Sequence, residues 1–125
     1  MKLDIRTVEP SQLKAELLRL RDVEKMDFLE NLIGMDWGEE GGLGVVYMLY
    51  STSTGKRENL RCSTTDRVNP VIPTASDLWD IANIYEREVY DFYGIIFAGQ
   101  PDMRRIYLRE DWVGYPMRKD DDPIK

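Results

Sequence analysis

The first third of the chain alternates between a strand pattern and helix patterns. Residues 2–8 alternate apolar and polar positions, which predicts a strand. From Ser11, leucines recur at spacings of three and four, which predicts an amphipathic helix capped by Ser11. Its apolar face consists of Leu13, Leu17, Leu18 and Leu20. Residues 27–35 predict a second, short helix with the apolar residues Phe28, Leu29, Leu32 and Ile33.

The middle of the chain has the pattern of a β-hairpin. Residues 38–44 (GEEGGLG) predict a loop, and the apolar run 45–50 (VVYMLY) predicts a buried strand. Residues 51–57 (STSTGKR) predict a turn, and residues 58–65 predict the returning strand. The Asn-Pro and Ile-Pro steps within residues 69–73 predict an extended connector, because a residue before proline avoids the helical region.

A longer helix is predicted from Ser76, its N-cap, to Tyr93, and Gly94 is well placed to end it. Its apolar face alternates spacings of four and three and consists of Leu78, Ala82, Tyr85, Val89 and Phe92. Residues 95–97 predict a short strand or an apolar plug. From Gly99 onward, glycines and prolines interrupt any regular pattern.

The order of these elements predicts an α+β fold with a small, mostly antiparallel sheet, helices packed on one face and an irregular C-terminal arm. We expect the α+β domain over residues 1–97 and an extended docking arm over residues 98–125. A chain of 125 residues is long enough for one such domain.

Composition excludes several classes of function. The net charge of −6 argues against nucleic acid as a partner, because duplex binding requires a positive surface. No apolar run approaches the length of a membrane span, and the N-terminal residues lack the apolar core of a signal peptide. The glycines of residues 42–44 precede a strand, so they do not match a nucleotide-binding loop.

The absence of histidine, with a single cysteine, limits the chemistry. One chain of this composition cannot supply the ligands of a usual zinc site or iron–sulfur cluster. Without histidine, catalysis by a histidine base or a histidine-containing triad is also excluded. Cys62 lies in a predicted strand and is expected to be half-buried there. A role as nucleophile is not expected, because no usual partner base is present.

Residues 86–119 combine charges with aromatic residues, glycines and prolines. The six acids are Glu86, Glu88, Asp91, Asp102, Glu110 and Asp111, and the six bases are Arg87, Arg104, Arg105, Arg109, Arg118 and Lys119. We interpret this segment as a surface that is ordered by pairing with another protein. Tyr107, Trp112 and Tyr115 match the composition of interface hot spots. The alternative is that these rings fold back onto the domain.

The same charges allow other interpretations. Glu86, Glu88 and Asp91 crowd one helix end and could serve a stand-alone enzyme as general acid or base, if burial separated their pKa values. Structural ion pairing is the simpler interpretation, since Arg87 lies four residues before Asp91. Adjacent arginines at 104–105 point in opposite directions in an extended segment, so each is expected to meet a different acid, within the chain or across an interface. A simple interaction domain is a third hypothesis.

The order of residues in this last third resembles one family. The motifs are EREVYD at 86–91, GI at 94–95, Phe97, Gly99, PDMRRI at 101–106, EDW at 110–112, Gly114, Pro116 and RKD at 118–120. They resemble the thirty-kilodalton subunit, also named the C subunit, of the proton-pumping NADH:quinone oxidoreductase, which is respiratory complex I. The preceding residues are compatible with that family in pattern only.

The resemblance implies a cofactor-free chain in the hydrophilic arm of the complex, peripheral to the cytoplasmic face of the inner membrane. FMN, iron–sulfur clusters, NADH and quinone then belong to the assembled complex, which couples electron transfer to proton translocation. The resemblance also implies that the arm packs against the large quinone-site subunit, with other hydrophilic-arm subunits nearby. The expected docking residues are Glu86, Arg87, Glu88, Asp91, Asp102, Arg104, Arg105, Glu110, Asp111, Trp112, Tyr115, Arg118 and Lys119.

The chain departs from the family at Gln100, which stands where the family usually has the histidine of Gly-His-Pro-Asp. An amide can replace one imidazole hydrogen bond but cannot titrate, so a pH-sensing role of this position does not carry over. Membrane-bound hydrogenases and ferredoxin-dependent relatives contain a similar subunit. The electron donor of the complex therefore stays open.

Overall fold

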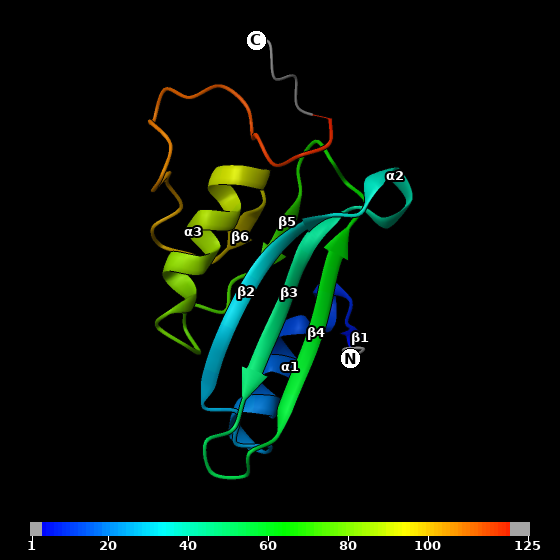
Figure 1. The fold of residues 1–125 in the computed structure, drawn as a ribbon, viewed down its shortest axis with the longest axis vertical. Helices are drawn as coiled ribbons and strands as arrows, with labels where there is room; N and C mark the ends of the chain where they lie inside the picture. The colour runs from blue at the N-terminus through cyan, green and yellow to red at the C-terminus, as the bar shows by residue number, and fades with distance from the viewer. Residues whose placement is uncertain (1–3, 121–125) are drawn as a thin grey trace.

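The computed structural model describes residues 4–120 and has two sheets and three helices within them (Figure 1). The larger sheet has the strand order β1-β4-β3-β2, and the smaller one pairs β5 with β6. The elements are β1 (Arg6–Thr7), α1 (Pro10–Asp22), β2 (Phe28–Asp36), α2 (Gly38–Gly41), β3 (Leu43–Tyr50), β4 (Arg57–Thr64), β5 (Val71–Pro73), α3 (Ala82–Tyr93) and β6 (Ile96–Ala98). The predicted α+β class with a mostly antiparallel sheet is confirmed.

The central hairpin forms as its pattern predicts. β3 and β4 pair antiparallel from Tyr50↔Arg57 to Leu43↔Thr64, and the turn between them is closed by the Ser51 N–H, which donates to the Lys56 carbonyl. The apolar run of β3 is buried almost throughout because it lies in the middle of the sheet. α1 crosses behind this sheet (Figure 1) and buries Leu13, Leu17 and Leu20 of its predicted apolar face. The prediction that Leu18 widens this face is wrong, because Leu18 is exposed.

The helix predicted over residues 27–35 is wrong, because this segment is strand β2. β2 pairs with β3 along its whole length, with a bulge between Leu29 and Asn31. The extra residue of a bulge moves the following side chain to the opposite face. Leu29 and Leu32 therefore both point into the core although they are three residues apart, a spacing that imitates a helix.

Further boundaries differ from the predictions. α1 begins at Pro10 with Glu9 as its N-cap, so the predicted Ser11 cap is wrong. β1 has only two residues, and residues 2 and 3 of the predicted strand lie outside the described residues. The predicted loop 38–44 contains the short helix α2 and the first residues of β3. α3 begins at Ala82 instead of Ser76, because the preceding residues form turns in which the indole N–H of the buried Trp79 donates to the Met26 carbonyl (3.1 Å).

α3 packs closely against β2 and ends at Gly94, as predicted. Gly94 adopts a left-handed conformation (φ 76°), and its N–H donates to the Tyr90 carbonyl (2.9 Å). The close approach requires Gly34 in β2, since a Cβ there would lie 2.5 Å from the Tyr93 ring. After α3 the chain forms β6, which pairs parallel with β5 and so confirms the short strand predicted near residues 95–97.

From Gly99 to the end of the described residues, the chain contains no helix or strand, as expected for an arm. It runs along the outer side of α3 and crosses above the C-terminal end of that helix (Figure 1). The division into a domain 1–97 and an arm 98–125 stays a prediction, and residues 121–125 lie outside the described residues.

Candidate functional site

Asp91 is the main attachment point of the arm to the domain. Its fully buried carboxylate accepts the backbone N–H groups of Ile106 (3.2 Å), Tyr107 (2.7 Å) and Leu108 (2.9 Å) through Oδ2. Its Oδ1 accepts Arg105 Nη1 at 2.9 Å. Burial acts to raise the pKa of Asp91, but the N–H groups of Leu108 and Tyr107 and the Arg105 guanidinium outweigh burial and hold that pKa below its usual value. The charged form of Asp91 therefore fixes the path of the arm.

Arg105 connects α3 with a later part of the arm. Besides the Asp91 carboxylate, its guanidinium donates to the carbonyls of Asp91 (2.8 Å) and Gly114 (2.8 Å) and lies over the Tyr115 ring, 4.9 Å from its centroid. Only 8% of its side chain is exposed. A planar guanidinium with several donors suits this position, where a lysine could not make the same set of contacts.

Glu86 holds the beginning of the arm from inside the domain. Its buried carboxylate accepts Thr74 Oγ1 (2.5 Å), the Ala75 N–H (2.6 Å) and Gln100 Nε2 (3.0 Å). Burial raises the pKa of Glu86 to about 7, although these three hydrogen bonds lower it. Gln100, the departure from the family, thus donates its amide to Glu86, while its oxygen accepts Asn83 Nδ2 (2.9 Å). Solvent does not reach this carboxylate, so the arrangement favours a structural role over acid–base catalysis.

A second cluster, which sequence reasoning missed, attaches the end of the arm to the end of β2. Asp36 accepts Arg67 Nη2 (2.7 Å) and the backbone N–H of Lys119 (2.8 Å). Arg67 also pairs with Asp120 (3.1 Å), and Arg118 Nη2 donates to the Arg67 carbonyl (2.8 Å). The Arg67 guanidinium holds the pKa of Asp36 well below its usual range. Nothing in the spacing of residues 36 and 67 could have indicated this contact, because they belong to separate segments.

The remaining predicted docking residues have different surroundings. The ion pair expected between Arg87 and Asp91 is absent from the contacts of the described residues. Arg87 instead pairs with Asp102 (3.5 Å), because Asp91 is already enclosed by the arm. Asp102 also pairs with Arg104 (2.6 Å), so each of the adjacent arginines at 104 and 105 meets a different acid, as predicted.

Other members of that set lie at the surface. Arg109 and Asp111 form an exposed pair (3.2 Å). Arg118, by contrast, is mostly covered and pairs with Asp120 (2.8 Å). Within residues 4–120, Glu88 and Glu110 make no ion pair. The charges of the arm therefore mostly connect the chain to itself.

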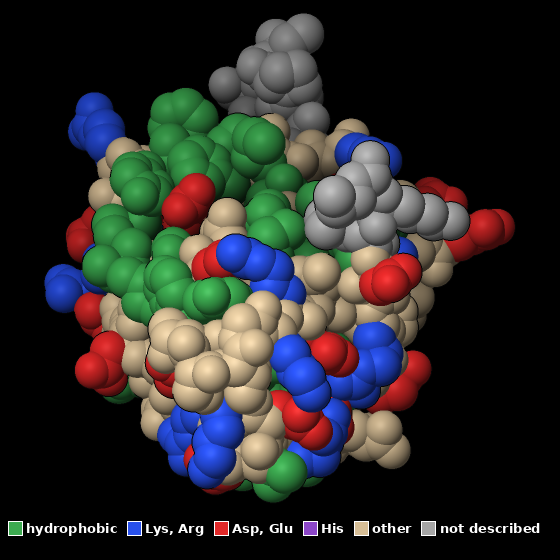
Figure 2. Space-filling view, turned by 60° about the horizontal axis from the view of Figure 1, so that its bottom comes forward, with side chains coloured by type: hydrophobic (Ala, Val, Ile, Leu, Met, Phe, Trp, Pro, Cys, Tyr) green, Lys and Arg blue, Asp and Glu red, His purple; other side chains and the backbone are tan. Residues whose placement is uncertain are grey.

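The large side chains of the arm show a different distribution. Tyr115 packs inward beside Gly94 and Tyr90, with ring centroids of the two tyrosines 6.1 Å apart. Tyr107 stacks on Phe92 of α3 at 6.0 Å, yet most of its ring stays exposed. The exposed large apolar residues of the arm are Tyr107, Trp112, Val113 and Met117. Figure 2 shows hydrophobic side chains gathered at the upper left of that view, while acids and bases alternate over the lower right.

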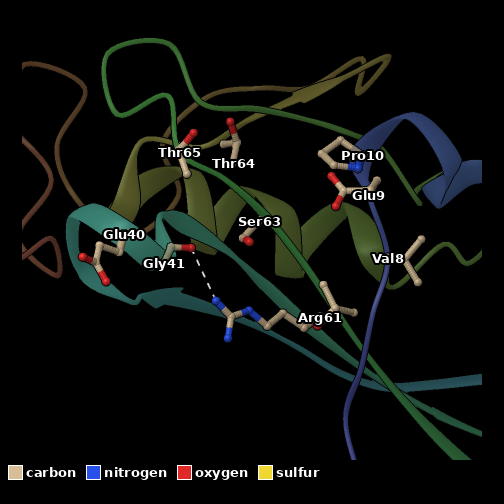
Figure 3. Close-up of a pocket in the computed structure, with 10 residues that line it drawn as sticks. Val8, Glu9, Pro10, Glu40, Gly41, Arg61, Ser63, Thr64 and Thr65 are labelled. Carbon is tan, nitrogen blue, oxygen red and sulfur yellow. Dashed lines mark hydrogen bonds between the residues drawn. The ribbon is translucent and has the colours of Figure 1, made fainter.

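A polar cavity of about 460 Å³ lies between the start of α1, α2 and β4 (Figure 3). Arg61 lies here over the Trp37 ring, 3.7 Å from its centroid, and donates to the Gly41 carbonyl at 3.4 Å. The lining also includes the carboxylates of Glu9 and Glu40 and several hydroxyl groups. Its charges are mixed in sign, and they include no nucleophile paired with a base among the residues that line it.

Other reactive groups are few in the described part of the chain. Cys62 is fully buried, deeper than the half-buried position predicted, and burial raises the pKa of its thiol to about 12. Between residues 4 and 120, no cluster of three or more cysteines and carboxylates is arranged to hold a metal ion. No helix in that range has the length and apolarity needed to cross a bilayer.

Comparison with known sequences relates the chain to one family. The family model described as respiratory-chain NADH dehydrogenase, 30 Kd subunit, matches residues 6–125. The C/D subunit of NADH-quinone oxidoreductase from Bacteroides thetaiotaomicron is 57% identical over 98% of this chain, which spans 25% of that relative. The C subunit of NADH-quinone oxidoreductase from Chloroherpeton thalassium is 41% identical over 93% of this chain and 48% of the relative. The chain thus spans between a quarter and a half of the length of these relatives.

Solved structures show the same relationship. A trypsin-resistant fragment of Nqo5 is 31% identical, with a TM-score of 0.72 over 78% of this chain and 80% of that one. A chain of the membrane-bound sulfane sulfur reductase, an archaeal respiratory membrane complex, is 26% identical, with a TM-score of 0.81 over 99% of this chain and 76% of that one. The chain belongs to the family of the thirty-kilodalton subunit of respiratory-chain NADH dehydrogenase.

Proposed function

We propose that this chain is a cofactor-free scaffold subunit in the hydrophilic arm of a complex I-type NADH:quinone oxidoreductase. Its arm docks against the large quinone-site subunit and holds that subunit in place for electron transfer coupled to proton translocation. The complex binds FMN, iron–sulfur clusters, NADH and quinone in its other subunits. The chain reaches the cytoplasmic face of the inner membrane only through these neighbours. Family membership and the names of the relatives support this proposal.

The observation that carries the docking role is the construction of the arm. Two attachments hold a segment without helix or strand against the domain. Arg105 pairs with the buried Asp91, and residues 119 and 120 bind the Asp36–Arg67 pair. The same fold leaves Trp112 and Val113 exposed. An ordered segment that presents aromatic and apolar side chains loses little conformational entropy on binding and matches the centre of a protein interface.

This construction changes the roles proposed for the thirteen docking residues. Asp91, Arg105 and Glu86 act inside the chain, as positioning residues that determine the shape of the docking surface. Trp112, Glu88 and Glu110 are free to contact the partner directly. Recognition is then mainly apolar, with charges at its border, as at other protein interfaces.

A related complex is the second candidate. The chain aligns over nearly its whole length with a subunit of the archaeal sulfane sulfur reductase complex, which favours a fold shared among several respiratory complexes. In that case the scaffold role is the same and the electron donor differs.

The test is an Arg105→Glu substitution in the full chain, with recovery of the large subunit from the native membrane fraction as the readout. The substitution places a carboxylate beside Asp91, which costs about 3–5 kcal/mol for a broken buried pair. We expect the variant to lose the large subunit, while Arg109→Glu, at an exposed pair, recovers it normally. Normal recovery with Arg105→Glu would contradict the docking role of the arm.

A further inference from the structure

The outer edge of β2 is open along the half that lies nearest the arm. β2 is the last strand of its sheet, and its first half is protected by the bulge and by the Tyr85 hydroxyl, which donates to the Glu30 carbonyl (3.2 Å). Residues 31–36 include neither lysine nor proline, the residues that usually protect an edge strand. This part of the strand is therefore able to pair with a further strand.

A hydrogen bond just beyond the C-terminal end of β2 shows which of its backbone N–H and C=O groups face β3 and which face outward. The Trp37 N–H donates to the Gly42 carbonyl (2.9 Å) and continues the ladder with β3, so alternate residues of β2, such as Ile33 and Met35, face β3. Leu32, Gly34 and Asp36 then direct their N–H and C=O groups outward. In agreement, the Leu32 N–H is bound by the side chain of its neighbour Asn31 (2.9 Å) instead of by β3.

Gly34 is the centre of this open edge. It is buried, but no hydrogen bond from any described residue outside the ladder reaches its outward N–H and C=O. The outward N–H and C=O groups of an edge strand, when they lack a partner in the protein, offer hydrogen bonds to an added strand. A groove of about 520 Å³ lies along the edge, between β2 and α3, with room for an extended segment.

The lining of the groove specifies the kind of segment that fits. Ile33, Phe92 and Met117 supply apolar contacts, and Glu88, an acid without an ion pair in the described part of the chain, is the charged residue of the lining. The groove is also continuous with the arm, because the Met117 N–H donates to the Phe92 carbonyl (3.0 Å) and the Lys119 N–H to Asp36. The end of the arm and this edge therefore form one continuous surface.

We infer that the groove between β2 and α3 binds an extended segment of the large quinone-site partner, which pairs with Gly34, Asp36 and the Leu32 carbonyl as a further strand of the sheet. The segment has apolar side chains at alternate positions and a basic residue opposite Glu88. Main-chain hydrogen bonds supply affinity in such strand addition, and the side-chain contacts supply specificity. This inference depends on the proposed function for the identity of the partner.

Residue-resolved hydrogen exchange tests the pairing directly. The tagged full chain is compared free and in the complex recovered from the native membrane fraction. We expect the outward N–H of Gly34 and Asp36 to exchange at least roughly ten-fold more slowly in the complex. The inward N–H of Ile33 and Met35 should be protected in both samples, because they already pair with β3.

Two substitutions test the side chains. Ile33→Lys places a charge at the open edge, and Glu88→Arg reverses the charge of the groove. Both should reduce recovery of the large subunit by roughly ten-fold or more, as expected when an interface contact is removed. Ile84→Lys is the matched control, since Ile84 is similarly exposed (44%, against 37% for Ile33) but lies outside the groove.

The outcomes separate the inference from the proposed function. If the partner is recovered but Gly34 stays unprotected, or if Ile33→Lys behaves as Ile84→Lys, the groove is not the binding site and the scaffold role still stands. If the outward N–H groups are protected in the free chain and this protection depends on its concentration, a second copy occupies the edge and the inference is wrong. If the wild-type chain recovers no large subunit, both fail.

Discussion

An Asp91→Asn substitution tests whether a buried charge holds the arm. Asparagine has the shape of aspartate but only one acceptor oxygen, whereas the carboxylate of Asp91 serves the Arg105 guanidinium on Oδ1 and three backbone N–H groups on Oδ2. In either orientation of the amide, its NH2 group faces a donor. We expect the segment 105–108 to separate from α3 while the sheet stays folded.

The magnitude follows from the burial of the pair. Arg105 is 8% exposed and would keep its charge without a counter-charge, a situation that costs about 3–5 kcal/mol. Because each 1.4 kcal/mol is about a ten-fold change in an equilibrium constant, local opening of the arm should become at least about a hundred-fold more frequent.

The assay is amide hydrogen exchange, followed by NMR, of Ile106, Tyr107 and Leu108. In the wild-type chain these N–H groups should be protected, because each donates to Asp91, and in the variant their exchange should accelerate by the factor given above. Asp111→Asn is the control, since its exposed pair with Arg109 is worth less than about 1 kcal/mol. Exchange in the variant within about two-fold of wild type would refute this account of the arm.

Two further predictions concern the helix that carries these residues. Glu86 has a folded pKa of about 7, above its ordinary value of 4.5, so its contribution to stability is fully present below pH 4.5 and is lost as the pH rises through 7. The loss is on the order of 3 kcal/mol. Glu86→Gln should therefore remove this pH-dependent part of the unfolding free energy measured with urea, and parallel curves for variant and wild type between pH 4.5 and 7.5 would argue against it. Gly94→Ala should destabilise the chain by at least about 1 kcal/mol, because Gly94 has φ 76° and an added Cβ would lie 2.8 Å from the Tyr115 ring. A midpoint of urea unfolding equal to that of wild type would show that the arm does not pack on this helix end.

Hydrophobic periodicity predicts the elements in which the spacing of apolar residues matches the face that is buried in the folded chain. The leucines of α1 face the sheet, and the run of β3 lies in its middle, as their spacings indicate. β2 could not be predicted in this way, because its bulge gives a strand the residue spacing of a helix. Helix α3 begins late for a similar reason, since the turn around Trp79 is determined by its contact with Met26.

The sequence predicted most residues of the candidate site but not which of them contact each other. The motifs of the last third indicate which acids and bases belong to the arm. They do not indicate whether those charges pair within the chain or with a partner, because an ion pair depends on the path of the chain in space. Asp91 and Arg105 pair inside the chain. Asp36 and Arg67 were missed, as neither belongs to a recognisable motif.

The scaffold role is tested most directly by capture of the wild-type chain from its native membrane fraction, with identification and quantification of the proteins that remain bound. We predict recovery of the large quinone-site subunit in equal amount with this chain, together with other hydrophilic-arm subunits and their flavin and iron–sulfur absorbance. Recovery of the chain without any redox subunit, or turnover by the purified chain alone, would contradict the account.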